Sequence, residues 1–274
     1  MKLDMGRAWN DAIAMLSGNL QVVLILAGVF FFLPNFALTL LMPETMVEVE
    51  AQTAGAADFE AIFQALGTAY AEIWWQMLLV SLFSAIGMLS LLALLTDRTR
   101  PTVGEALKAG VMYLLSYLGA QIMIVLVMAA IVAIVWTTGS TAGVGAGVLV
   151  GLVAFVAAVY IFTKFVLTVP VIVIEGVKNP VHALGRSWSL TKGNSVRLVL
   201  FFLLLGVAFI VIAGVVGVIG GVVGLLMGEE GTLIVNSLIN AAINMVAASV
   251  YLAVLAAVHR QLSGEAREVG ATFE

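Results

Sequence analysis

Six long runs of apolar residues, separated by shorter polar segments, set the pattern of this chain. Each run comes close to or exceeds the roughly 20 residues with which an α-helix crosses the apolar core of a bilayer. We therefore predict six transmembrane helices, over residues 20–42, 73–95, 118–136, 145–168, 196–226 and 233–258. The fifth run exceeds one bilayer thickness, so we expect it to tilt, to bend at its glycines or to extend past the headgroups.

Three shorter stretches precede the first, third and fifth runs: "MGRAWNDAIAMLSGN", "TVGEALKAGVMYLLSY" and "PVHALGRSWSLTKGN". Apolar residues recur in each at helical spacing, which is typical of an amphipathic helix at a membrane surface. The pattern predicts an all-α bundle within a single membrane domain, residues 1–274. In it, a surface helix and a hairpin of two spans occur three times, over 3–95, 101–168 and 179–260. The alternative is that amphipathic segments resemble one another without a repeat.

The composition excludes a water-soluble fold. Hydrophobic residues make up 62% of the chain and charged residues 10%, whereas soluble domains have about 45–50% apolar and about 25% charged residues. The chain has no cysteine, which excludes disulfides and thiolate metal sites. We therefore classify it as a polytopic membrane protein.

The basic residues are segregated along the chain. All twelve Lys and Arg residues fall in the N-terminal segment, around 98–108, between 164 and 197, or after 259. The other connections contain none, and two of these three are acidic: 43–72, 137–144 and 227–232. Because basic loops stay on the cytoplasmic side, we expect both termini in the cytoplasm. The basic residues are too few for a nucleic-acid surface.

The most polar segment next to the spans is "EGVKNPVHALGRSWSLTKGN", residues 175–194. Its Asn179-Pro180 pair predicts the start of a helix, with Asn179 as the N-cap and Pro180 in the first turn. A topology signal alone would need no acid at this place. We therefore expect Glu175 to pair with Arg186 or Lys192.

This segment and its continuation hold the candidates for contact with phospholipid headgroups: Glu175, Lys178, Arg186, Trp188, Lys192 and Arg197. A basic residue near an anionic membrane surface contributes about 1 kcal/mol, and Lys164 adds to the same charge. Trp188 suits the interface as an anchor, because its ring is apolar and its N–H is polar. The alternative is that these charges only set the topology.

The same segment carries a resemblance to a known family. Its residues are Pro170, Glu175-Gly176, Asn179-Pro180, Ala183-Leu184, Arg186-Ser187-Trp188, Leu190-Thr191 and Gly193. They are similar to the signature of the glycerophosphoryl diester phosphodiesterase membrane-domain family. The six-span layout also resembles that of related bacterial inner-membrane proteins of uncharacterised role. The resemblance implies a multi-pass protein of the cell inner membrane.

Some members of that family carry a fused catalytic phosphodiesterase barrel. This sequence reaches Glu274 without room for a barrel, and it has no cluster of His, Glu and Asp that would hold a metal. We therefore do not carry the phosphodiesterase activity over. We expect no catalytic residue, no metal site, no cofactor and hence no enzyme.

Three amides form a polar stripe on the sixth predicted span, because Asn236, Asn240 and Asn244 are four residues apart. They are interpreted as contacts between helices, since buried amides in lipid find partners. The alternative is a polar path for a substrate. Candidate partners on other spans are Asn35, Gln76 and Gln121, and we expect Pro34 to kink the first span and to free a carbonyl.

Glycines at four-residue spacing mark two further helix faces. On the fourth span they are Gly143, Gly147 and Gly151; on the fifth they are Gly217 and Gly221, together with Gly220, Gly224 and Gly228. Small residues let helix backbones approach closely in membranes. We predict that the fourth and fifth spans pack together through these faces. The alternative is a homodimer through one of them.

The function that these observations favour is a non-enzymatic inner-membrane protein that binds phospholipid headgroups, or is organised by them, on the cytoplasmic leaflet. One alternative is a small transporter or lipid-translocating protein that uses the asparagine stripe. Another is a scaffold subunit that docks a membrane-protein partner.

Overall fold

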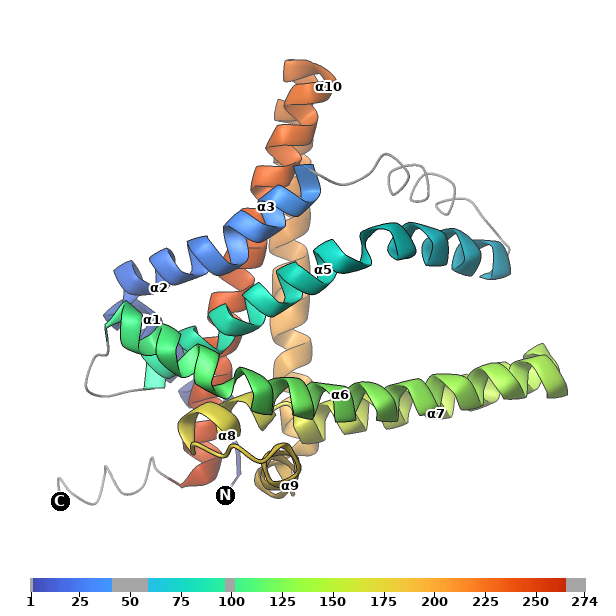
Figure 1. The fold of residues 1–274 in the computed structure, drawn as a ribbon, viewed down its shortest axis with the longest axis horizontal. Coiled ribbons are helices and arrows are strands. Elements are labelled where there is room, and N and C mark those ends of the chain that lie inside the picture. Colours follow the sequence, from blue (N-terminus) through green and yellow to red (C-terminus); the bar gives the residue numbers. More distant parts are fainter. Residues whose placement is uncertain (1, 41–58, 97–101, 265–274) are drawn as a thin grey trace.

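The computed structural model describes residues 2–40, 59–96 and 102–264. These residues are helical apart from short connections (Figure 1). The helices are α1 (Met5–Gly18), α2 (Leu20–Ala27), the π-helical turn η1 (Gly28–Phe32), α3 (Leu33–Leu40), α5 (Phe59–Thr96), α6 (Val103–Ala142), α7 (Val144–Phe165), α8 (Thr168–Ile174), α9 (Pro180–Thr191) and α10 (Ser195–Ser263). The predicted all-α fold is confirmed. Most of the acidic connection 43–72 lies outside the described residues.

Six helical segments are long and apolar enough to cross a membrane: Leu20–Leu40, Ile73–Thr96, Val103–Ala142, Gly145–Ile174, Ser195–Gly228 and Glu230–Ser263. The predicted spans are thereby confirmed. The last two belong to α10, which breaks at Gly228 because the backbone there leaves helical geometry. The sidedness of the termini and the threefold repeat stay predictions.

Only two of the three amphipathic stretches form helices of their own. α1 ends at Gly18, and α9 ends at Thr191, shortly before Gly193 turns the chain with a φ of 81°. The stretch within 101–116 instead continues into α6 without a break, because no Pro or positive-φ Gly interrupts it. Its start is fixed by a capping box, in which Thr102 and Glu105 bond each other's backbone N–H. The prediction of a separate surface helix before the third span is therefore wrong.

The buried core lies at one end of the molecule, where the spans and the short helices meet. Its fully buried side chains include Leu92 of α5, Ile172 of α8 and Leu255 of α10. From this core, the hairpin of α6 and α7 and the hairpin within α10 extend in different directions (Figure 1). Their outer parts expose apolar side chains such as Leu126 and Phe155, as helices that face lipid do.

Both of these hairpins turn at a glycine with positive φ. Gly143 has a φ of 87° and Gly228 a φ of 80°, a conformation that favours glycine because it has no Cβ. Gly139 and Gly147 lie four residues before and after Gly143. A Cβ built on Gly147 would lie 2.8 Å from the Cα of Gly139. The two helix backbones are therefore in contact.

The α10 hairpin closes in the same way, because a Cβ on Gly224 would lie 2.9 Å from the Cα of Thr232. The glycines thus pack each helix against its own hairpin partner, and the prediction that the fourth and fifth spans pack through them is wrong. Gly143 forms a turn rather than a packing face, and Gly151 contacts Val135 of α6. A Cβ on Gly217 or Gly221 would meet no atom within 4 Å.

The first span contains the π-turn η1 immediately before Pro34. Pro34 has no N–H to offer to the carbonyl of Phe30 one helical turn earlier. The Ser84 Oγ of α5 approaches that carbonyl at 3.5 Å, and the Asn35 Nδ2 donates to the next one, Phe31 O, at 2.8 Å. The expected free carbonyl is therefore used to join two spans.

Candidate lipid-headgroup site

Helix α9 lies at the end of the molecule that holds the buried core, and its start is set by the predicted cap. The Asn179 Oδ1 accepts hydrogen bonds from the N–H groups of Val181 at 2.9 Å and His182 at 3.3 Å. Pro180 occupies the first turn. Its ring packs against Gly119 of α6, where a Cβ would lie 3.2 Å away. The N-cap prediction is confirmed.

One face of α9 is buried against the end of α7. The Ser187 Oγ donates to the carbonyl oxygen of Lys164 at 2.7 Å, and Ser187 is fully buried. Ala183 and Leu190 are buried on the same side. This contact fixes α9 against the C-terminal turn of α7.

Glu175 ends α8 and joins it to two other helices. The Arg186 Nε of α9 donates to both carboxylate oxygens, at 3.1 and 2.9 Å, and the His259 Nε2 of α10 lies 3.0 Å from Oε1. The expected pair of Glu175 with Arg186 is confirmed, whereas Lys192 takes no part in it. His259 is fully buried. Sequence analysis did not select it, although it is the first ionisable residue after a long apolar run.

The charge state of Glu175 follows from these neighbours. Burial raises the pKa of the carboxyl, but the hydrogen bonds from Arg186 and His259 and their charges outweigh it, so the net shift of the pKa is downward. Glu175 is therefore ionised at neutral pH. Its charge is balanced within the protein by Arg186.

Lys164 lies in the last turn of α7 and is only 3% exposed. Its Nζ lies 5.3 Å from the ring centroid of Tyr160 and 5.4 Å from that of Trp188. The two rings meet edge to face at 5.7 Å. A cation above an aromatic ring is attracted to it, which offsets part of the cost of burial. Among the described residues, no carboxylate lies within ion-pair distance of Lys164.

Lys192 and Lys178 are exposed, and Trp188 is 40% exposed. Lys192 follows directly on α9, and its positive charge acts on Lys164. Two cations thus share the junction of α7 and α9, which we name the Lys164–Lys192 site. Sequence analysis had counted Lys164 only as part of the general surface charge, because its burial depends on α9.

Arg197 makes a contact that the sequence did not predict. Its Nη1 donates to the carbonyl oxygen of Leu3 at 3.1 Å, and the Leu3 N–H donates to the Asn194 Oδ1 at 2.9 Å. The Asp4 N–H donates to the Gln261 Oε1 at 3.2 Å. Arg197 therefore fastens the N-terminal segment to the base of α10, while its side chain stays exposed. Its contact with headgroups stays a prediction.

The asparagine stripe is only partly engaged between helices. The Asn35 Nδ2 approaches the Asn244 Oδ1 at 3.4 Å, which joins the first and sixth spans. The Asn240 Nδ2 instead donates to the backbone carbonyl of Asn236, one turn earlier on its own helix. The contact of Asn244 supports the interpretation as a helix contact.

No group of three or more His, Asp and Glu residues that could hold a metal occurs in the described ranges 2–40, 59–96 and 102–264. The Ser187 hydroxyl is used by the Lys164 carbonyl, and no acid or histidine is bonded to it.

Comparison with known families places the site in context. Residues 144–262 match the family model described as the membrane domain of glycerophosphoryl diester phosphodiesterase. The match covers less than half of the chain and includes α7, α8, α9, and α10 to its last turn, and it confirms the resemblance inferred from the sequence. No curated protein and no solved structure matches the chain.

Proposed function

We propose that this chain is a non-enzymatic protein of the cell inner membrane that binds the phosphate of a phospholipid headgroup at the Lys164–Lys192 site. The observation that carries the proposal is the burial of Lys164 beside a second lysine, with no carboxylate within ion-pair distance in the described part of the chain. The leaflet would be the cytoplasmic one, because the basic residues cluster at this end of the spans.

The pairing inside the site decides which cations are available. Arg186 is held by Glu175 through both carboxylate oxygens, so its charge is largely compensated. Arg197 donates to the N-terminal backbone. Of the predicted cluster, Lys192, Lys178 and Arg197 have no carboxylate partner among the described residues, and Lys164 joins them. Arg197 lies apart from them, at the base of α10. The headgroup site is therefore centred on Lys164 of α7 and Lys192 at the end of α9, and not on the pair of Arg186 and Glu175.

The energetics favour an anionic ligand. The Lys164 side chain is almost fully covered by its neighbours, and no carboxylate among the described residues pairs with its ammonium group. A phosphate group would satisfy the Lys164 ammonium and relieve its repulsion with Lys192. The Trp188 ring meets the Tyr160 ring edge to face and lies 5.4 Å from the Lys164 Nζ, while part of its surface is exposed. Such a ring suits the polar–apolar boundary of a membrane.

The test is retention of anionic lipid by the purified chain. Native mass spectrometry of the protein from nanodiscs of phosphatidylglycerol and phosphatidylethanolamine should show bound phosphatidylglycerol. The double variant Lys164→Met with Lys192→Gln should weaken this binding about thirtyfold, since two charges contribute roughly 1 kcal/mol each.

Lys178→Gln is the matched control, because it removes an exposed lysine of the same segment that lies outside the site. It should change binding by no more than about threefold, since one remote charge counts for less than 1 kcal/mol. Equal retention of phosphatidylglycerol by the double variant and the wild type would refute the proposal.

A further inference from the structure

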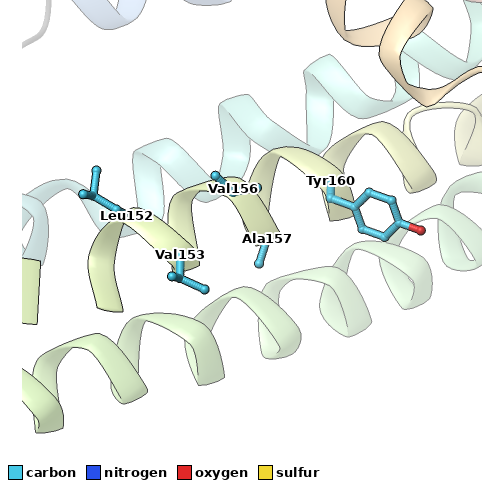
Figure 2. A pocket seen from close by; sticks show the side chains of 5 residues that line it. All are labelled: Leu152, Val153, Val156, Ala157 and Tyr160. Carbon is cyan, nitrogen blue, oxygen red and sulfur yellow. The ribbon is translucent and has the colours of Figure 1, made fainter. Parts of the chain in front are cut away.

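The surface of α7 that leads to Lys164 carries a shallow apolar depression, mostly open to its surroundings, which we name the trough. Its volume is about 550 Å³, and it is lined by Leu152, Val153, Val156, Ala157 and Tyr160 (Figure 2). The geometry points to this trough as the place of one acyl chain of the lipid whose phosphate lies at the Lys164–Lys192 site. The inference rests on the proposed function and adds to it the class of ligand, an acylated anionic phospholipid.

The trough and the buried cation belong to one helix face. Side chains three and four residues apart lie above one another on a helix, so Val153, Ala157, Tyr160 and Lys164 form a continuous row. Tyr160 joins the two parts, because its ring lines the trough and also lies 5.3 Å from the Lys164 Nζ. A ligand in the row would have its apolar part beside Ala157 and its anionic part beside Lys164.

The length of the row matches one leaflet. From Leu152 to Lys164 the helix rises by about 18 Å, at 1.5 Å per residue. Half of the roughly 30 Å apolar core of a bilayer is about 15 Å. An acyl chain anchored by its headgroup at Lys164 would therefore run along the trough to about the middle of the membrane.

Charge complementarity decides between a lipid and a protein occupant. A partner helix in the trough would leave Lys164 and Lys192 uncompensated unless it also carried an acid at that depth, and acids within spans are rare. A phospholipid presents the anionic and the apolar part together. The other walls of α7 are exposed and apolar, as at Phe155, but they lack a cation at their end.

The experiment maps where a labelled chain lies. The full-length protein is placed in phosphatidylethanolamine nanodiscs with a small fraction of phosphatidylglycerol that carries a diazirine in the middle of one acyl chain. After illumination, cross-links are located by peptide mass spectrometry. We expect them to be enriched severalfold at Leu152, Val153, Val156 and Ala157 over the remaining exposed surface of α7, which includes Phe155.

Two variants separate the chain site from the headgroup site. Ala157→Trp fills the trough and should abolish the enrichment while phosphatidylglycerol is still retained. Phe155→Trp is the control, because Phe155 lies two residues from Ala157 and therefore about 200° from it around the helix. This variant should leave the enrichment unchanged. Lys164→Met with Lys192→Gln should abolish both enrichment and retention.

The outcomes distinguish the two proposals. Retained phosphatidylglycerol with cross-links spread evenly around α7 would overturn the acyl-chain site and leave the headgroup site standing. Retention that does not depend on the two lysines would overturn both. Competition by soluble glycerol phosphate as strong as that by phosphatidylglycerol, or cross-links from the trough to a second protein chain, would overturn the acyl-chain site.

Discussion

Replacing Gly110 by leucine is expected to force α5 and α6 apart and to leave no stably folded protein. A Cβ at this position would lie 2.8 Å from the backbone oxygen of Ile86 and 3.2 Å from the backbone nitrogen of Ser90, and it would overlap the Ser90 Oγ. That hydroxyl already donates to the Ile86 carbonyl at 2.7 Å. Backbone atoms cannot move aside as a flexible side chain can, so the two helices themselves must separate.

The expected cost exceeds about 3 kcal/mol, the upper part of the usual range for overpacking, because leucine adds a whole side chain to a backbone contact. Thermal unfolding in detergent, followed by tryptophan fluorescence and size-exclusion chromatography, measures it. Gly214→Leu is the control, since it lies in α10 and a Cβ there meets nothing within 4 Å. It should change the free energy of unfolding by less than about 0.5 kcal/mol. Equal melting temperatures for the two variants would show that α5 and α6 are not packed as described.

The spans and helix starts could be predicted from the sequence because they depend on local features. A run of about 20 apolar residues is sufficient to form a spanning helix. Asn179-Pro180 carries its own capping chemistry, and the structure shows the bonds to Val181 and His182. The acid Glu175 stood out within a basic segment, and its partner Arg186 lies only eleven residues away.

The partners of helix faces could not be predicted in the same way. Four-residue spacing shows that Gly147 and Gly224 belong to packing faces, but it does not show which helix they meet. Each proved to pack across its own hairpin turn, against Gly139 and Thr232. The signal that would have shown this is the position of Gly143 and Gly228, each about midway between the two contacting residues.

The buried members of the site depend on contacts that are remote in sequence. Lys164 is buried because α9 brings Trp188 over it, and His259 meets Glu175 across 84 residues. The contact of Arg197 with the Leu3 carbonyl likewise joins segments that are far apart in the sequence. In each case the residue type was informative, but the partner that decides its role comes from another helix.

Replacing Glu175 by glutamine is expected to loosen the junction of α8, α9 and α10. The variant keeps the shape of the side chain but removes the charge that Arg186 and His259 face. Hydrogen bonds to a charged group are worth about 1.5–3 kcal/mol. Arg186 is 44% exposed on its side chain and can regain water, so we expect a loss of about 2 kcal/mol at pH 7. The control is Glu230→Gln, an exposed acid beside the Gly228 turn of α10, which should leave stability unchanged.

The pH dependence of this effect has a definite sign. Because the folded state lowers the pKa of Glu175, the ionised carboxylate stabilises the fold fully above its ordinary value of 4.5. That stabilisation is lost as the pH falls below 4.5 and through the lowered pKa. The difference in melting temperature between the wild type and Glu175→Gln should therefore shrink as the pH falls below 4.5 towards pH 3. Other carboxylates, such as Asp11 beside Arg260, titrate in both proteins and cancel in the difference. A difference that grows on acidification would mean that Glu175 is protonated in the folded protein, and the ion pair with Arg186 would then not hold the three helices together.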